Sequence, residues 1–358
     1  MNTRFQVTSA GYVDRPDQSL VPRFPQRAER IELGLEVEHT RTEPVMLIGH
    51  GSSGTSICAG LIRKYCAVAF GNESQFLIRL NRLAQTWGDL SDPRVLRGAV
   101  DYMLQERYFK KAAQIYGFHP TAEQILARLQ QPTMSGIYHA LFSLLAEHQQ
   151  TDRWGDKTPE YMEHLPELNA LFPNAQYILV VRDGRDTALS VMSRYYGPNN
   201  LVVAAQEWRE TARQGMQFLE TLPADRKLVV RYEDMMGNPV ETLRTVMNFL
   251  GAHPRDPHMF ERIGPMVREE LRANNFNKWK KKMSLREREI FESLAGPELK
   301  YYGFETEFAA PRPPSSLQMS LFPWHDRLMR LVHPRSFRNN IYRLGMRLRD
   351  WWNTRRLK

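Results

Sequence analysis

The sequence predicts an α/β fold in which a parallel β-sheet is flanked by helices. Three apolar runs of strand length, at residues 45–48, 177–181 and 227–232, are each followed by a turn and a stretch with helical periodicity. Parallel strands are covered by helices on both faces, so they appear in a sequence as continuous apolar runs. We therefore expect one α/β domain over residues 44–305.

The composition is that of an ordinary globular protein. At 358 residues with 42 % hydrophobic content, the chain can bury a large core. No stretch reaches the ~20 consecutive apolar residues of a membrane-spanning helix, and the first residues lack a signal-peptide core, so we expect a cytoplasmic protein. Cys58 and Cys66 lie on one predicted helix and should both be buried thiols. Because no Cys/His cluster has ligand spacing, we expect no metal site.

The positive charge is concentrated at the C-terminus. Of the net charge of +9, residues 314–358 contribute ten Arg or Lys against two Asp, so the rest of the chain is nearly neutral. A nucleic-acid enzyme more often has its positive field around the catalytic site. We therefore expect no nucleic-acid partner.

Two segments outside the strand–helix units, residues 1–43 and 74–150, also have patterns that predict their structure. Residues 1–43 are polar and contain several prolines, which predicts an irregular N-terminal arm. Residues 74–150 have apolar residues at helical spacing, which predicts an insertion of about four helices and a wall for a substrate pocket.

The C-terminal segment, residues 306–358, is predicted to be a proline-rich linker followed by a basic amphipathic helix. The helix is indicated by apolar residues at helical spacing among arginines: Phe337, Ile341, Leu344, Leu348 and Trp351. This pattern is typical of a helix that lies on an anionic membrane, here through residues 324–358 at the inner membrane face. The alternative is that its apolar stripe packs on the body of the protein or on a second subunit in a homodimer.

A glycine-rich turn, GHGSSG at residues 49–54, follows the first strand and precedes a helix that opens at Thr55. Such a turn directs backbone N–H groups and the positive end of the helix dipole into one concavity, which predicts a phosphate or sulfate ester as ligand. The spacing of Gly49 and Gly54 matches a phosphate loop, but nucleotide hydrolases have a lysine where this chain has Thr55. A turn that only joins strand to helix is the alternative. The residues assigned to the site are Gly51, Ser52, Ser53, Gly54, Thr55 and Ser56.

Further motifs follow this turn in the chain. Residues 154–159 have the sequence WGDKTP, residues 182–190 RDGRDTALS, residues 230–234 VRYED, and residues 277–280 NKWK. In this order the motifs resemble those of the sulfotransferases that use 3′-phosphoadenylyl sulfate (PAPS), of the bacterial, carbohydrate or tyrosylprotein type.

The resemblance implies a P-loop-type sheet, PAPS as donor and an acceptor bound on the side of the helical insertion. Arg182 and Ser190 would hold the 3′-phosphate, a group that ATP lacks. Tyr232, Lys278 and Lys280 match positions around the nucleotide. The implied reaction moves a sulfonate to a hydroxyl, with an amine as the alternative acceptor, and requires no metal.

The same resemblance places a catalytic carboxylate at Glu73, nineteen residues after Gly54. Glu73 follows a short apolar segment that begins at Val68, so it is expected at the ligand-binding edge of the sheet. His119 and His139 are the rival bases. Lys157 matches the family's lysine near the transferred group. His50 is a second candidate cation, because this chain has Ser52 where most relatives have Arg or Lys.

Two other functions remain open from the sequence. A phosphate-loop kinase would use ATP and Mg²⁺, but it needs a lysine at position 55 and a metal-binding acid. A membrane-associated relative with a vestigial nucleotide site would need neither base nor cation. The acceptor stays open among glycan, lipid, peptide and small metabolite, since all would use the same donor.

Overall fold

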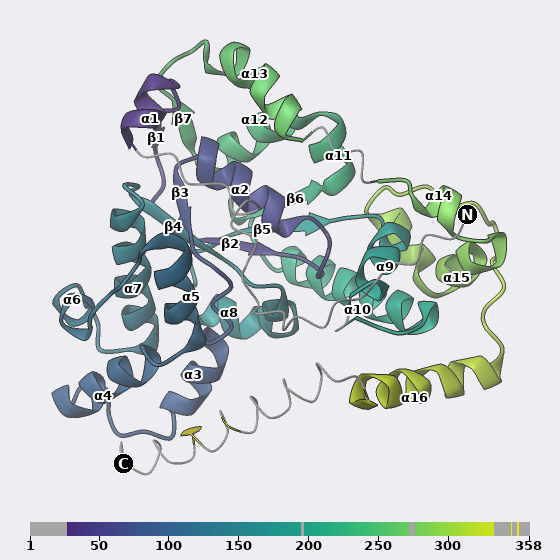
Figure 1. The fold of residues 1–358 in the computed structure, drawn as a ribbon, viewed down its shortest axis with the longest axis horizontal. Helices are drawn as coiled ribbons and strands as arrows, with labels where there is room; N and C mark the ends of the chain where they lie inside the picture. Colours follow the sequence, from purple (N-terminus) through teal and green to yellow (C-terminus); the bar gives the residue numbers. More distant parts are fainter. Residues whose placement is uncertain (1–26, 195–196, 272–275, 333–344, 346–348, 351–358) are drawn as a thin grey trace, which may run out of the picture.

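A five-stranded parallel sheet forms the centre of the structure, a computed structural model that describes residues 27–194, 197–271, 276–332, 345 and 349–350 (Figure 1). The strand order is β3-β4-β2-β5-β6, and every neighbouring pair is parallel. The strands are β2 (Val45–Ile48), β3 (Val68–Phe70), β4 (Arg153–Lys157), β5 (Gln176–Val181) and β6 (Lys227–Arg231). The predicted α/β class with a parallel sheet is confirmed.

Helices cover both faces of this sheet and form two cores. Along β2, Val45 and Leu47 point into one core while Met46 and Ile48 point into the other, as the period of two along a strand requires. The first core is covered by α2 (Thr55–Tyr65), α11 (Tyr232–Gly237), α12 (Pro239–Leu250) and α13 (Met259–Glu270). The second is covered mainly by α7 (Met134–His148), α8 (Leu165–Leu171), α9 (Gly184–Met192), α10 (Leu201–Glu220) and α15 (Leu285–Tyr301).

Strand β4 is an inner strand that the apolar pattern does not predict. Its first residue, Arg153, is only 1 % exposed. The Arg153 guanidinium donates to the backbone carbonyls of Glu43 and Leu250, each at 2.6 Å, and to Gln176 Oε1 at 2.5 Å. A buried charge is tolerated when its hydrogen-bonding groups are satisfied in this way.

The insertion between β3 and β4 is helical, as predicted. It comprises α3 (Leu77–Ala84), α4 (Pro93–Met103), α5 (Arg107–Tyr116), α6 (Ala122–Ala127) and α7. An aromatic cluster lies inside it: the Phe76 ring centroid is 5.5 Å from that of Tyr108 and 6.0 Å from that of Tyr138. These aromatic side chains form the core of the insertion.

The N-terminal segment is more regular than the sequence suggests. Residues 27–43, expected to be irregular, contain α1 (Arg27–Glu32) and β1 (Val37–His39), and β1 pairs antiparallel with β7 (Ala252–Pro254). Pairing with a distant strand fixes this segment, and local sequence gives no sign of such a partner. Cys58 and Cys66 are buried free thiols, as expected.

The C-terminal part begins with α14 (Trp279–Lys282) and α15 and continues into α16 (Ser316–Val332). Of the predicted amphipathic stripe, Phe337, Ile341, Leu344, Leu348 and Trp351 lie outside the described residues. Among the residues the structure describes, no helix has the length and apolarity needed to cross a membrane. The structure also contains two short 3₁₀ helices, Pro159–His164 and Ala224–Arg226.

Candidate active site

The predicted site residues gather at one edge of the sheet. Lys157 is the last residue of β4, Arg182 directly follows β5 and Tyr232 directly follows β6. Glu73 comes shortly after β3, and the glycine turn comes directly after β2. Since all five strands are parallel, their carboxyl ends lie together, where open α/β sheets bind their ligands.

The glycine turn has the backbone conformation of an anion-binding loop. Gly54 has φ 97° and Ser52 has φ 69°, and helix α2 begins at Thr55 without a side-chain cap. A Cβ on Gly54 would lie 2.4 Å from Cδ2 of Tyr232, so only glycine fits there. The hydroxyls of Ser52 and Ser53 are buried without a hydrogen-bond partner in the described protein. The N–H groups in the first turn of a helix have no intrahelical acceptor either, so the loop suits an anionic group.

Arg182 joins the two predicted anion-binding motifs. Its side chain is buried, its Nη1 donates to the carbonyl of Ser52 at 3.2 Å, and its guanidinium stacks over the Tyr232 ring with Cζ 4.7 Å from the centroid. Ser190 lies two turns along α9 and is half-buried. The loop after β2 and the motif after β5 thus form one continuous surface, as one nucleotide bound by both requires.

Lys157 and Glu73 form an ion pair beside this surface. Lys157 Nζ lies 2.5 Å from Glu73 Oε1. The Lys157 side chain is 12 % exposed and that of Glu73 is 36 % exposed, so the carboxylate is the member of the pair that solvent reaches. Strands β3 and β4 are neighbours, which brings the two side chains together.

The structure places His50 in a role other than that of a cation. Its Nδ1 lies 2.6 Å from the carbonyl of Gly51, where it donates a hydrogen bond. Burial lowers the pKa of His50, partly offset by this hydrogen bond and by the charge of Glu207. A neutral imidazole can shape the loop but adds no positive charge.

The rival bases lie in other surroundings. His139 packs against the Trp154 ring at 5.3 Å and the Phe172 ring at 5.4 Å, and burial lowers its pKa. His119 is exposed on the helical insertion, just before α6. Neither histidine comes from a strand end at the carboxyl edge, which leaves Glu73 as the candidate with the right position.

Tyr232 and the segment 277–280 support the site from two sides. Tyr232 is 2 % exposed and lies beneath Gly54 and Arg182, so it acts as a platform for both. The backbone N–H of Trp279 donates to Asp186 Oδ1 at 3.0 Å, which fixes the segment against α9. Lys278 is exposed at the start of α14, and Lys280 Nζ lies 3.6 Å from Glu305 Oε2.

Arg185, in the same motif as Arg182, has a structural role that the sequence did not reveal. It is fully buried and forms ion pairs with Asp183 at 2.7 Å and Glu292 at 2.8 Å. Its guanidinium stacks 3.5 Å from the centroid of the Trp279 ring. These contacts connect α9, α14 and α15, so the second arginine of RDGRD holds the scaffold that positions the first.

Two buried carboxyl groups lie next to the site residues. Desolvation raises the pKa of Asp156 to about 6, although hydrogen bonds from Thr158 and Ser74 oppose the rise. Desolvation also raises the pKa of Glu233 to about 7; Glu233 Oε1 accepts the N–H of Asp183 at 3.0 Å. Both lie in motifs found in the sequence, WGDKTP and VRYED, but the sequence assigned neither of them a role.

Asp156 should make stability depend on pH. Its folded pKa of about 6 exceeds the ordinary value of 3.8, so between these pH values the folded protein holds a proton that the unfolded chain has lost. Stability therefore falls as pH rises through this window. Asp156→Asn should remove a penalty of about 3 kcal/mol at pH 8 and little at pH 4.

Urea unfolding at pH 4, 6 and 8 measures this effect. Asp152→Asn is the matched control, because Asp152 is an exposed acid just before the same strand and should leave the pH profile unchanged. A pH profile of Asp156→Asn that parallels that of the original protein would show that folding does not raise the pKa of Asp156.

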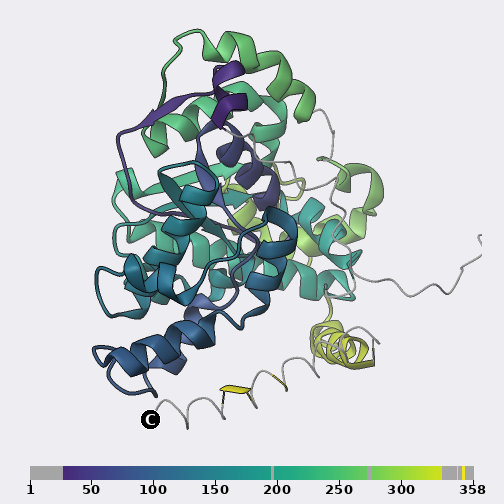
Figure 2. The ribbon, with the colours of Figure 1, turned by 60° about the vertical axis from the view of Figure 1, so that its left-hand side comes forward.

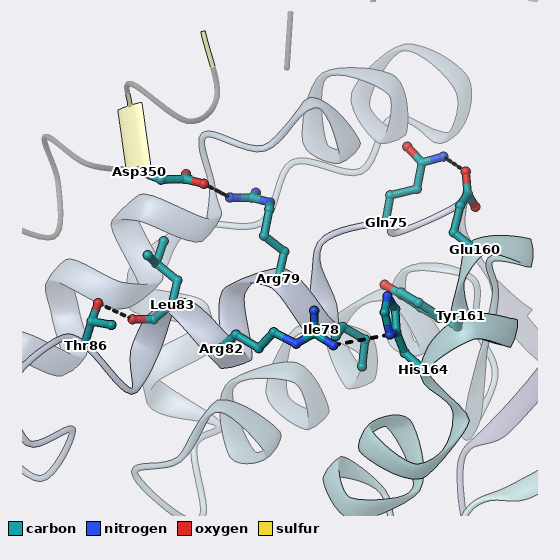
Figure 3. A pocket seen from close by; sticks show the side chains of 10 residues that line it. All are labelled: Gln75, Ile78, Arg79, Arg82, Leu83, Thr86, Glu160, Tyr161, His164 and Asp350. Atoms are coloured by element: carbon teal, nitrogen blue, oxygen red, sulfur yellow. Dashed lines mark hydrogen bonds and ion pairs between the residues drawn. The ribbon is translucent and has the colours of Figure 1, made fainter. Parts of the chain in front are cut away.

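A cavity of about 420 Å³ lies near Glu73, and the side chain of Gln75 stands between the two (Figure 3). Gln75 lines it and donates to Glu73 Oε2 at 3.5 Å and to Glu160 Oε1 at 2.8 Å. On the opposite wall, Arg79 Nη1 donates to the two carboxylate oxygens of Asp350 at 2.9 and 3.0 Å. A described residue of the C-terminal tail therefore completes the cavity, whose other walls come from α3 and the segment that follows β4.

Comparison with known proteins agrees with this geometry. Residues 44–256, more than half of the chain, match the family model described as "Sulfotransferase family". The chain is 25 % identical over 225 residues to protein-tyrosine sulfotransferase A of Caenorhabditis elegans, covering 59 % of this chain and 51 % of that protein. It is 23 % identical over 239 residues to protein-tyrosine sulfotransferase 2 of Gallus gallus, covering 64 % and 57 %. The chain thus spans about half the length of the curated relatives it matches.

Solved structures give weaker similarities. The sulfotransferase domain from the curacin biosynthetic pathway superposes with a TM-score of 0.48 at 16 % identity, covering 75 % of this chain and 99 % of that domain. A mouse sulfotransferase complexed with PAP superposes with a TM-score of 0.42 at 13 % identity, covering 79 % and 91 %.

Proposed function

We propose, since the chain belongs to the sulfotransferase family, that it transfers the sulfonate of PAPS to an acceptor hydroxyl and releases adenosine 3′,5′-bisphosphate (PAP). The observation that supports this most is the contact between Arg182 and the carbonyl of Ser52. It brings the two anion-binding motifs together beside the Lys157–Glu73 pair.

The donor would be held at both of its anionic ends. Backbone N–H groups of the loop, the dipole of α2 and the buried hydroxyls of Ser52 and Ser53 suit the 5′-phosphosulfate. Arg182, with the hydroxyl of Ser190, suits the 3′-phosphate, because a guanidinium can donate two hydrogen bonds to one phosphate. No lysine is then needed at Thr55, and the absence of a metal requirement stays a prediction.

The donor supplies an activated sulfonate, and the protein supplies proton transfer and charge stabilisation. Lys157 neutralises Glu73 in the structure. An anionic donor at the loop competes with Glu73 for the Lys157 ammonium group. A carboxylate without a cation at hydrogen-bond distance accepts a proton more readily. Donor binding would thus prepare Glu73 to take the proton of the acceptor hydroxyl, while Lys157 stabilises charge near the leaving phosphate.

The acceptor would enter through the cavity beside Gln75. Its walls combine apolar parts of Ile78 and Leu83 with polar groups such as those of Arg82 and His164 (Figure 3). These walls suit an acceptor that has both a hydroxyl group and an apolar part. Glycans, lipids, peptides and small metabolites all include such compounds. The similarity to protein-tyrosine sulfotransferases makes a tyrosine-containing peptide the first acceptor to assay.

Thermal unfolding with PAP and with Mg·ATP tests the choice of donor. A ligand present at about 100 times its Kd stabilises the folded state by about 2.7 kcal/mol. PAP should therefore raise the Tm by several degrees, and Mg·ATP at the same concentration should raise it less. Stabilisation by Mg·ATP alone would favour a phosphate-loop kinase. Labelled sulfonate transfer from PAPS to acceptor mixtures then separates an enzyme from a vestigial site that only binds.

A further inference from the structure

Helix α16 presents a continuous apolar stripe to solvent. Leu317, Leu321, Trp324 and Leu328 are 67, 53, 69 and 60 % exposed. Their spacing of four, three and four residues places them on one face of the helix. Exposed apolar groups scattered singly over a protein need no explanation, but a stripe along one helix marks an interaction site.

The opposite face of α16 is fixed to the body of the protein. Asp326 Oδ1 accepts the backbone N–H of Asn199 at 2.6 Å, and Asn200 Nδ2 donates to the carbonyl of Phe322 at 3.1 Å. Met319 and Phe322 pack against the main core. The helix therefore does not turn its apolar stripe inward, and the stripe belongs to a positioned surface.

The net charge of the C-terminal segment that contains α16 favours an anionic partner. Residues 314–358 contain ten Arg or Lys, and their only acids are Asp326 and Asp350. Asp326 is directed to Asn199 and Asp350 to Arg79, so both acids face the protein. In both views, α16 and residues 349–350 lie along the lower edge of the molecule (Figures 1 and 2). A concentrated positive charge would oppose association with the same segment of a second copy and favour an anionic surface.

We propose that the stripe formed by Leu317, Leu321, Trp324 and Leu328 is a docking surface for an anionic lipid bilayer. The leucines would enter the boundary between headgroups and acyl chains. Trp324 suits that boundary, since its ring is apolar and its N–H is polar. Arg327, which is exposed on the same helix with its Cζ 5.5 Å from the centroid of the Trp324 ring, would contact anionic headgroups. The proposal is independent of the donor and acceptor, so vesicle binding tests it whether or not the protein transfers sulfonate.

Cosedimentation of the full chain with vesicles tests the proposal. The protein should bind vesicles containing 30 % phosphatidylserine in phosphatidylcholine at least tenfold more tightly than pure phosphatidylcholine, with weaker binding in high salt. Leu321→Glu with Leu328→Glu should reduce binding to the anionic vesicles at least tenfold. Leu285→Glu is the matched control, because Leu285 is a leucine 63 % exposed on another helix, and it should bind normally.

Circular dichroism melting of each variant excludes a folding defect, and sedimentation velocity reports the oligomeric state. Failure of the original protein to bind anionic vesicles would overturn the proposal. So would equal binding by the double variant, since the stripe would then not be the surface that docks. A concentration-dependent dimer that the double variant abolishes, without vesicle binding, would identify a second copy of this chain as the occupant instead.

Discussion

Glu73→Gln is expected to lower kcat for sulfonate transfer by about 10²- to 10⁴-fold, the usual contribution of a positioned general base. The amide has the shape of the carboxylate but cannot take the proton of an acceptor hydroxyl. Binding of PAP should stay within about twofold of the original affinity, because Glu73 lies beside the anion-binding loop and not in it. Single-turnover assays with labelled PAPS give the rate, and calorimetric titration with PAP gives the affinity.

Glu160→Gln is the control for this substitution. Glu160 also accepts a hydrogen bond from Gln75, at 2.8 Å, but its carboxylate is not the partner of Lys157. Because Glu160 lines the acceptor cavity, its substitution can raise KM for the acceptor, but kcat should stay close to the original value if the proton passes to Glu73. Normal turnover by Glu73→Gln would show that another group is the base.

The central strands could be predicted because residues buried on both faces of a sheet are mostly apolar, and such runs can be recognised in a sequence. Strand β2 is buried at all four positions and β5 at all six, and both are apolar runs except for Gln176 at the start of β5. Once these runs are identified as parallel strands, the residues that follow them must meet at one edge. The strand pattern therefore predicts that the glycine turn and Arg182 lie at the same edge of the sheet, and the family resemblance assigns both to one nucleotide.

Strand β4 escaped prediction because tertiary contacts compensate for its polar residues. Arg153 is buried through carbonyls supplied by Glu43 and Leu250, which lie far away in the chain. Tyr232 was expected near the nucleotide, but the packing of its ring beneath Gly54 is a contact that no local pattern indicates. Sequence patterns therefore identified the residues that would touch the donor more readily than those that support them.

Arg182→Ala is expected to reduce the affinity for PAP by about 100-fold or more. A hydrogen bond to a charged group contributes about 1.5–3 kcal/mol, and a guanidinium can donate two to a phosphate. The substitution also removes the contact with the Ser52 carbonyl, so part of the loss would come from a less ordered loop. Arg182→Lys keeps the charge without the planar fork, and its affinity should be intermediate. Calorimetric titration with PAP measures all three proteins.

Arg226→Ala separates this loss from general damage. Arg226 is likewise part-buried and donates to a backbone carbonyl, that of Ala175 at 2.9 Å, but it lies just before β6 and so at the amino edge of the sheet. Its removal should lower the Tm and leave the affinity for PAP unchanged. If Arg182→Ala bound PAP as tightly as Arg226→Ala, the 3′-phosphate would have to be held elsewhere, and the loop alone would not distinguish PAPS from other anionic esters.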